Sequence, residues 1–418
     1  MNNRVIGEAG NRGIDWASLA FSRISKLTAR AEHLGVPLLM RSPLNICYFA
    51  QSWVSDWNHG NVHFLRGLAS ELVRMGHRVR CYEQLGSWSL MNLVRHEGER
   101  AIAAIDAFRE RFPQLDVHFY ENKNGFANEM TRELRGVDVV IFHEWNDPAV
   151  VQQVLSLKKR LGFAALFHDT HHRAYSDPGA LLQMGLHLFD GVLAFGEALR
   201  RIYVNSFGIG RAWTFHEAAD VENFRPLASQ RDCDVLWLGN WGDEERTQEL
   251  EEFLLRPAEE LPEFTFVAHG VRYPREAQEK LREAGIQFRG YLPNLEAAAA
   301  YARSHIALHI PRRQYSGGLG GIPTIRVFEA LACGAALVCS PWEDRENLFR
   351  RGEDYLCVST AAAMKSEIEN LLKDETARRQ LASHGLETIQ RRHTCRHRAA
   401  QLTEICEELV RGAQAQVA

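Results

Sequence analysis

The chain has 418 residues, 45% of them hydrophobic and 24% charged, with a formal net charge of −4 and a pI near 6.5. This length exceeds one ordinary hydrophobic core and predicts two domains. The weak negative charge excludes non-specific attraction to nucleic acid, and no apolar run approaches the roughly 20 residues that a membrane span needs. Charged residues precede any apolar stretch at the N-terminus, so we expect no signal peptide and a cytoplasmic location. The eight cysteines form no CxxC pair, which predicts buried thiols.

The first half of the chain alternates apolar strands with helices. It begins with an amphipathic pattern over residues 14–35, which predicts a packing helix. A polar loop at 52–61 precedes a predicted helix at 62–77. Runs typical of buried strands lie at 44–51, 78–83, 116–121, 137–143, 163–169 and 191–196. This alternation predicts a parallel sheet covered on both faces.

The second half repeats the pattern after a polar break at 216–233. Predicted strands recur at 233–241, 264–270, 287–293, 305–311 and 334–340. A helical segment rich in Arg and His follows at 375–412. The predicted domains are an N-terminal helical extension (1–40), a Rossmann-like domain (41–225), a second Rossmann-like domain (226–385) and a C-terminal helical tail (386–418). Two such sheets predict a ligand cleft lined by the carboxyl ends of both sets of strands.

Several segments carry a family resemblance. Residues 60–79 resemble the first glycine loop and helix of GT-B glycosyltransferases, and residues 219–226 resemble the hinge after their first domain. Residues 323–340 resemble the donor-site helix of group-1, family 4-like enzymes. Together with residues 238–250, that helix is most similar to the CgeB-like branch. The resemblance implies the α/β GT-B fold, with two doubly wound parallel-sheet domains facing a cleft.

The same resemblance implies a function. We expect sugar transfer from a nucleoside-diphosphate sugar in the second domain to a hydroxyl-bearing acceptor in the first, retaining and without a metal or other cofactor. The acceptor is a glycan, a lipid-linked sugar or a small molecule, and peripheral membrane contact stays open. Family-4 enzymes usually carry two glutamates; the second corresponds to Glu329, but the first position holds Gly321. A nucleotide-sugar epimerase, which uses the same fold, is one alternative. A non-catalytic nucleotide-sugar binder is the other, because Gly321 stands where a glutamate is expected.

The helix after Pro323, stopped by Gly334, puts Arg326 and Glu329 on one face. Two interpretations follow. The side chains pair and stabilise the helix by about 0.2–0.5 kcal/mol, or Glu329 accepts hydrogen bonds from the donor ribose while Arg326 faces the diphosphate or sugar.

Further donor contacts are expected at glycine loops and strand ends. The glycines at 316–321 allow backbone N–H groups to approach a phosphate, although a mobile surface loop is the alternative. The Asp56–Asn61 loop is expected to face the donor phosphates or sugar. The predicted donor residues in these two segments and at the ends of second-domain strands are Gly60, Asn61, Gly239, Asn240, Tyr291, Leu292, Arg312, Gly320 and Gly321.

The reacting centre is expected where first-domain strands end in histidines and acids. The resemblance implies that His168 and Asp169 lie near the reacting sugar, and that Arg246 neutralises the departing phosphate unless it pairs with Asp243 or Glu249 on the helix surface. If the reaction inverts, Asp169 or a nearby histidine is the base; if it retains, the leaving phosphate takes the proton. Acceptor or sugar contacts are expected from His143, Glu144, His171 and His172, with structural histidines as the alternative. Their spacing fits no zinc motif.

Overall fold

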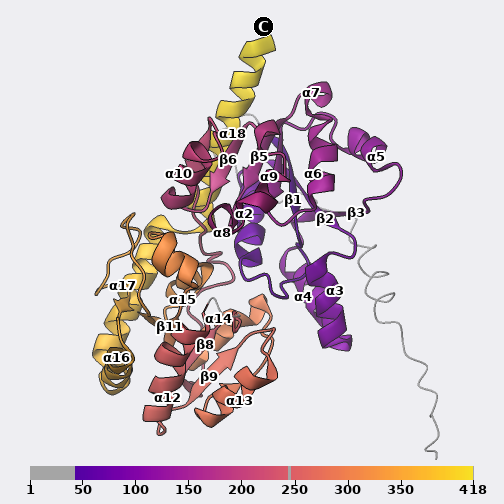
Figure 1. Cartoon of the computed structure of the whole chain (residues 1–418). Coiled ribbons are helices and arrows are strands. Elements are labelled where there is room, and N and C mark those ends of the chain that lie inside the picture. The colour runs from indigo at the N-terminus through magenta and orange to yellow at the C-terminus, as the bar shows by residue number, and fades with distance from the viewer. Residues whose placement is uncertain (1–42, 243–245, 418) are drawn as a thin grey trace, which may run out of the picture.

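The computed structural model describes residues 43–242 and 246–417 and arranges them as two lobes, each built on a parallel β-sheet (Figure 1). The two predicted parallel-sheet units are therefore confirmed. The predicted N-terminal extension (1–40) and its helix at 14–35 lie outside the described residues.

The first lobe contains a seven-stranded sheet in the order β3-β2-β1-β4-β5-β6-β7. The first strand, β1, pairs with β2 on one side and β4 on the other, with Ile46 opposite Val79 and Val139. The strands are β1 (Asn45–Ala50), β2 (Arg78–Gln84), β3 (Asp116–Tyr120), β4 (Val139–His143), β5 (Ala164–His168), β6 (Gly191–Ala194) and β7 (Ala212–Thr214). The central strands are almost wholly buried, as expected for a parallel sheet with helices on both faces.

The second lobe contains a six-stranded sheet in the order β10-β9-β8-β11-β12-β13. Its strands are β8 (Cys233–Leu238), β9 (Phe266–His269), β10 (Gln287–Phe288), β11 (Ser304–His309), β12 (Ala336–Cys339) and β13 (Leu356–Cys357). In each lobe the strand order reverses next to the first strand (β1 or β8). At such a reversal, the carboxyl ends of the neighbouring strands border a crevice.

Helices cover the sheets and link successive strands (Figure 1). In the first lobe they are α2 (Val62–Arg74), α3 (Trp88–Glu97), α4 (Glu99–Arg111), α5 (Phe126–Glu133), α6 (Pro148–Leu155), α7 (Lys158–Leu161), α8 (Arg173–Ser176), α9 (Pro178–Leu182), η1 (Leu186–Leu188) and α10 (Glu197–Asn205). After them come α11 (Thr247–Leu250), the π-turn η3 (Glu251–Leu255), α12 (Arg256–Glu260), α13 (Arg275–Glu283), α14 (Asn294–Arg303), the π-turn η4 (Gln314–Gly318), α15 (Ile325–Ala332), α16 (Ala361–Lys373), α17 (Glu375–Arg392) and α18 (Cys395–Val417).

Helix α15 starts later than the sequence predicts. Thr324 precedes its first residue, so Pro323 lies outside the helix rather than in its first turn. Its end agrees with the prediction: Gly334 has a positive φ of 67°, and its N–H donates to Leu331 O at 3.1 Å.

The last helix belongs spatially to the first lobe, although it follows the second in sequence. Helix α18 packs against α2, and a side chain at Gly67 of α2 would put its Cβ only 2.6 Å from Cys395 Sγ. At the crossing, Ala219 N donates to His393 O and Cys395 N donates to Ala219 O, both at 2.9 Å. The two chain segments that connect the lobes are therefore hydrogen-bonded to each other.

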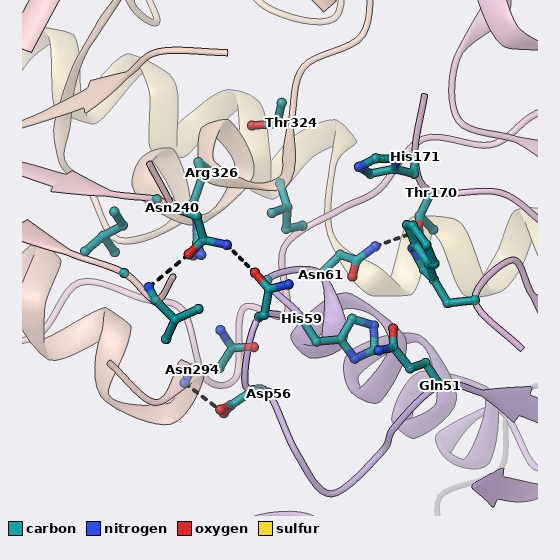
Figure 2. Close-up of a pocket in the computed structure, with 18 of the residues that line it drawn as sticks. Gln51, Asp56, His59, Asn61, Thr170, His171, Asn240, Asn294, Thr324 and Arg326 are labelled. Carbon is teal, nitrogen blue, oxygen red and sulfur yellow. Dashed lines mark hydrogen bonds between the residues drawn. The ribbon is translucent and has the colours of Figure 1, made fainter. Parts of the chain in front are cut away.

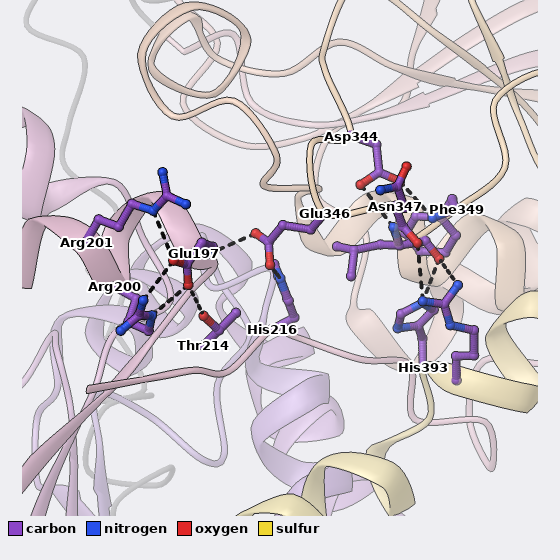
Figure 3. Close-up of polar contacts among 12 residues, drawn as sticks. Glu197, Arg200, Arg201, Thr214, His216, Asp344, Glu346, Asn347, Phe349 and His393 are labelled. Atoms are coloured by element: carbon purple, nitrogen blue, oxygen red, sulfur yellow. Dashed lines mark hydrogen bonds and ion pairs between the residues drawn. The ribbon is translucent and has the colours of Figure 1, made fainter. Parts of the chain in front are cut away.

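A second contact joins the lobes through one carboxylate. Glu346 of the second lobe accepts a hydrogen bond from the backbone N–H of Glu197 at 2.9 Å and lies 2.8 Å from His216 Nε2 (Figure 3). Because Glu197 begins α10, the Glu346 charge also faces a helix N-terminus.

Two further sequence predictions can be judged against the described residues. All eight cysteines are unpaired and seven are buried, as predicted. Within residues 43–417, apart from the gap at 243–245, no helix is long and apolar enough to cross a membrane.

Candidate functional site

The carboxyl ends of the two sheets face a common cavity of about 770 Å³, lined by both lobes. Its wall contains eleven of the predicted site residues: Gly60, Asn61, His171, His172, Gly239, Asn240, Arg246, Tyr291, Leu292, Arg312 and Arg326. Residues far apart in the sequence are thus brought together, as expected because the carboxyl ends of parallel strands lie at the same edge of a sheet.

The loop after β1 forms the first-lobe wall and reaches across to the second lobe. Asn58 has a φ of 50°, uncommon for a residue other than glycine, and accepts a hydrogen bond from Asn240 of the second lobe (Figure 2). Asn240 in turn accepts from Val271 N at 3.0 Å. Beneath the loop, the buried Arg66 donates to the carbonyl oxygens of Trp53 at 2.7 Å and Val54 at 3.0 Å, which fixes the loop on α2.

Asp56 makes another bridge between the lobes. Its carboxylate accepts from the Tyr291 hydroxyl. It also accepts, at 2.9 Å, from the backbone N–H of Asn294 at the start of α14 (Figure 2). The hydroxyl of Tyr291 is thus engaged, and its ring contributes to the cavity wall.

Arg246 is held at the first turn of the second lobe. Its guanidinium donates to Asn240 O at 2.7 Å and to Ile310 O at 3.2 Å, and lies 5.5 Å from the centre of the Trp237 ring. Glu249, one of the two acids that the sequence offers as partners of Arg246, pairs with Arg313 at 2.6 Å.

Arg326 lies on the cavity wall, one residue into α15, with a quarter of its side chain exposed. Gly60 faces it so closely that a Cβ there would lie 3.1 Å from Arg326 Nη2. Burial disfavours its charge, but Glu329 outweighs burial and raises the pKa of Arg326.

Glu329 lies one layer behind that wall, and its predicted contact with the donor ribose stays a prediction. It is fully buried and pairs with Arg326, accepts from the Tyr301 hydroxyl at 3.2 Å, and lies 3.1 Å from His63 Nδ1. Although burial raises the pKa of Glu329, Arg326 and His63 lower it further, so the carboxylate is ionised. The pairing interpretation is the one realised, and Glu329 orients Arg326 instead of lining the cavity.

The glycine-rich segment 316–321 does not reach the wall either. Part of it lies in η4, and a Cβ on Gly320 would lie 2.7 Å from Arg345 Nε. Gly321 is buried with a φ of 103°. Gly320 permits close packing and Gly321 a left-handed backbone, while their predicted approach to a phosphate stays a prediction.

The predicted reacting centre is also buried behind the wall. His168 ends β5 and contacts the Tyr48 hydroxyl, while His143 ends β4 with Nε2 2.8 Å from Thr170 Oγ1. Burial lowers the pKa of His143 to about 3 and that of His168 well below its ordinary value, so both are neutral. Neither residue lies on the cavity wall.

Asp169 and Glu144 lie in the same buried layer. Asp169 accepts from the Tyr203 hydroxyl at 2.7 Å and from His171 N at 2.9 Å, while Glu144 accepts from Thr170 N at 2.9 Å. Burial raises the pKa of Asp169 to about 6 and, together with Asp169, raises that of Glu144 well above normal. Both acids are fully buried, so neither touches a molecule in the cavity directly.

The structure adds wall residues that the sequence interpretation did not select. Glu217 follows β7, is 2% exposed and lines the cavity; Trp88 and Trp145 line it with 48% and 42% of their surface exposed. An acidic residue just past a strand at the domain break was the available signal for Glu217. Nothing in the pattern distinguished these two tryptophans from seven others.

Across the described residues, no group of three or more His, Cys, Asp or Glu side chains is arranged to hold a metal ion. The arginines on the cavity wall are Arg246, Arg272, Arg312 and Arg326.

Comparison with known proteins bears on this architecture. Residues 246–404 match the "Glycosyl transferase-like" sequence family, so the chain carries a glycosyltransferase-like domain. No curated protein sequence matches the chain.

Solved structures match over both lobes. HepE from Anabaena, in complex with UDP and glucose, superposes with a TM-score of 0.65 at 12% identity, over 88% of this chain and 100% of that one. Sucrose-phosphate synthase from Thermosynechococcus elongatus gives 0.61 at 14%, over 89% and 100%. AviGT4, a glycosyltransferase involved in avilamycin A biosynthesis, gives 0.55 at 18%, over 88% and 99%. The chain therefore has the GT-B fold.

Proposed function

We propose that this GT-B chain transfers a glycosyl group from a nucleoside-diphosphate sugar to a hydroxyl-bearing acceptor, and that it belongs to the CgeB-like branch. The observation that carries the proposal is one interlobe cavity whose second-lobe wall bears Arg246, Arg312 and Arg326. The match of residues 246–404 to a glycosyltransferase-like family, and the UDP and UDP-glucose held by HepE, support it.

The diphosphate would bind beside the start of α15. The first N–H groups of a helix have no intrahelical partner, and Thr324 makes no side-chain cap here. Thr324, Ile325 and Arg326 all line the cavity. Unpaired N–H groups, a positive helix terminus and a guanidinium held by Glu329 together favour an anion at this place.

Arg246 would stabilise the departing phosphate. Two carbonyl acceptors and the Trp237 ring fix the guanidinium before any ligand arrives. A preorganised cation does not have to reorient as charge develops on the leaving group, and this lowers the barrier. Three arginines around the diphosphate support a reaction without a bound metal ion.

The nucleobase would lie against Tyr291 and Leu292, with the Tyr291 ring held by Asp56 of the opposite lobe. Because that hydrogen bond crosses between lobes, nucleotide binding and closure would favour each other. Closure in turn excludes water from the donor.

The acceptor would enter past the first-lobe rim formed by Trp88 and Trp145. Exposed indole faces suit the C–H faces of a sugar ring, and Arg173 lies 4.4 Å from the Trp145 ring, which holds that indole in place. His171 and His172 on the same wall would contact acceptor hydroxyls. Because Asp169 is buried, retention is the favoured outcome, with the leaving phosphate accepting the acceptor proton.

Nucleoside diphosphate release, measured with and without candidate acceptors, tests the proposal. We expect release to depend on an acceptor. Sugar isomerisation without release would instead indicate an epimerase, and binding without either reaction would indicate a nucleotide-sugar binder. Absence of binding by UDP-, GDP- and ADP-sugars in calorimetry would overturn the proposal.

A further inference from the structure

Two buried polar side chains face the cavity with hydrogen-bonding atoms that no residue in the described part of the chain satisfies. His59 is 4% exposed and neither ring nitrogen has a partner among those residues; Glu217 is 2% exposed and its Oε1 has none there. Both line the cavity. Leaving such atoms unsatisfied costs about 1–3 kcal/mol each, so the arrangement is suited to a ligand that supplies the missing partners.

These side chains come from separate segments that meet in one corner of the first-lobe wall. His59 lies in the loop after β1 and Glu217 in the segment after β7. Asn61 connects them to the sheet, since it donates to Thr170 Oγ1 at 2.6 Å (Figure 2) and is hydrogen-bonded to Glu217. The corner is therefore built and held before a ligand arrives.

The corner carries no net charge at neutral pH. Burial, with His143 and Arg66, lowers the pKa of His59 well below normal. Burial, opposed by the Asn61 hydrogen bond and reinforced by Glu329, raises the pKa of Glu217 well above normal. The Arg326 charge acts on this acid and lowers its pKa, but Arg326 is itself paired with Glu329.

Neutral imidazole and protonated carboxyl groups each offer one donor and at least one acceptor. Sugar hydroxyls have the same dual character. A carboxylate or ammonium group placed here would instead be desolvated without a counter-ion, which is strongly unfavourable.

We propose that His59, Glu217 and Asn61 form the subsite for the glycosyl group of the donor, that they bind its hydroxyls, and that they select an uncharged sugar over a uronate or amino sugar. This inference rests on the proposed function. It assigns the sugar end of the donor to the first lobe, opposite the arginines that would hold the diphosphate.

Calorimetry that separates the sugar from the nucleotide tests it. UDP, GDP and ADP are compared with their glucose conjugates, and the pair that binds is carried forward. Glu217→Ala and His59→Ala should each weaken binding of the sugar conjugate at least tenfold while changing the free nucleotide less than twofold. Glu217→Gln should lose less than Glu217→Ala, because an amide keeps a donor and an acceptor. Glu222→Ala, an exposed acid five residues on, is the matched control.

A second measurement tests selectivity. The wild type should bind the glucose conjugate at least tenfold more tightly than the glucuronate or glucosamine conjugate. Equal losses for nucleotide and conjugate in the variants, or equal affinity for the three sugars, would overturn the inference while leaving the transferase intact. Absence of any nucleotide binding would overturn both. Should Glu217→Ala not fold, His59→Ala and Glu217→Gln decide the matter.

Discussion

His63 Nδ1 lies 3.1 Å from Glu329 Oε1, and this buried contact joins α2 of the first lobe to α15 of the second. Because Glu329 also pairs with Arg326, the position of the first-lobe helix α2 affects the orientation of Arg326, a cation that would hold the donor. The carboxylate therefore couples the relative position of the lobes to the diphosphate side of the cavity.

Glu329→Gln should weaken nucleotide-diphosphate binding about tenfold, because Arg326 loses the charge that orients it. Calorimetry measures the effect, and a double-mutant cycle assigns it: in an Arg326→Ala background the loss should vanish. A loss that persists there would mean that Glu329 contacts the donor itself. Glu329→Ala should also lower the free energy of unfolding by about 3 kcal/mol, because a buried pair is broken.

Arg246→Ala should reduce kcat by about 10²–10³-fold with a smaller change in donor affinity, since its cation would act mainly on the departing phosphate. Steady-state release of nucleoside diphosphate measures both. Arg313→Ala is the matched control, because that arginine pairs with Glu249 at 2.6 Å. Equal losses in the two variants would argue against a catalytic role for Arg246.

Asp56→Ala should open the molecule, because it removes the acceptor for the Tyr291 hydroxyl and for Asn294 N. Small-angle X-ray scattering of the ligand-free protein should give a larger radius of gyration than the wild type. Tyr291→Phe removes only one of the two hydrogen bonds, so its radius of gyration should lie between those of the wild type and Asp56→Ala. An unchanged radius in Asp56→Ala would show that other contacts hold the lobes closed.

Asp169 makes stability depend on pH. Burial raises its pKa from 3.8 to about 6, so the folded state binds this proton more tightly than the unfolded state. Its stabilising contribution is full below pH 4 and is lost as pH rises through 6. Between pH 4 and 7.5, urea unfolding should show the wild type losing up to about 3 kcal/mol relative to Asp169→Asn, which cannot ionise. Glu222→Gln, at an exposed site, should follow the wild type; parallel curves for Asp169→Asn would refute the shift.

Trp145→Ala should raise the KM for a glycan acceptor about tenfold and leave nucleotide affinity unchanged, because the exposed indole lies on the acceptor side of the wall. Initial rates at saturating donor measure this. Leu182→Ala provides the control, since Leu182 is 65% exposed and lies off the cavity. If Trp145→Ala changed the nucleotide affinity instead of the KM for the acceptor, Trp145 would not belong to the acceptor site.

The sequence was sufficient to predict the two sheets, because buried parallel strands are continuous apolar runs separated by helical patterns. It also located the cavity, since strand ends such as those before His171 and Arg246 converge at one edge. The sequence did not show whether a given residue lies on the cavity wall or is buried behind it. Arg326 and Glu329 share a helical face by spacing, yet one lies on the wall and the other a layer behind it.

The same limit applies to the histidines. His168 and His171 are three residues apart, but the first ends β5 and points to Tyr48, whereas the second lies past the strand and reaches the cavity. Which of the two residues extends past the end of the sheet depends on where the hydrogen bonds of the strand end. That point is set by the neighbouring strands rather than by the local sequence pattern. Glu217 was missed for the related reason that its importance comes from residues distant in the chain.

The backbone hydrogen bonds between Ala219 and the pair His393 and Cys395 constrain how the cavity can open. One connecting segment would allow the lobes to rotate about several axes, whereas two connecting segments that are hydrogen-bonded to each other restrict the rotation to one axis. We therefore expect the lobes to close without sliding past each other, so that Asn58 meets Asn240 and His63 meets Glu329 in the same alignment each time.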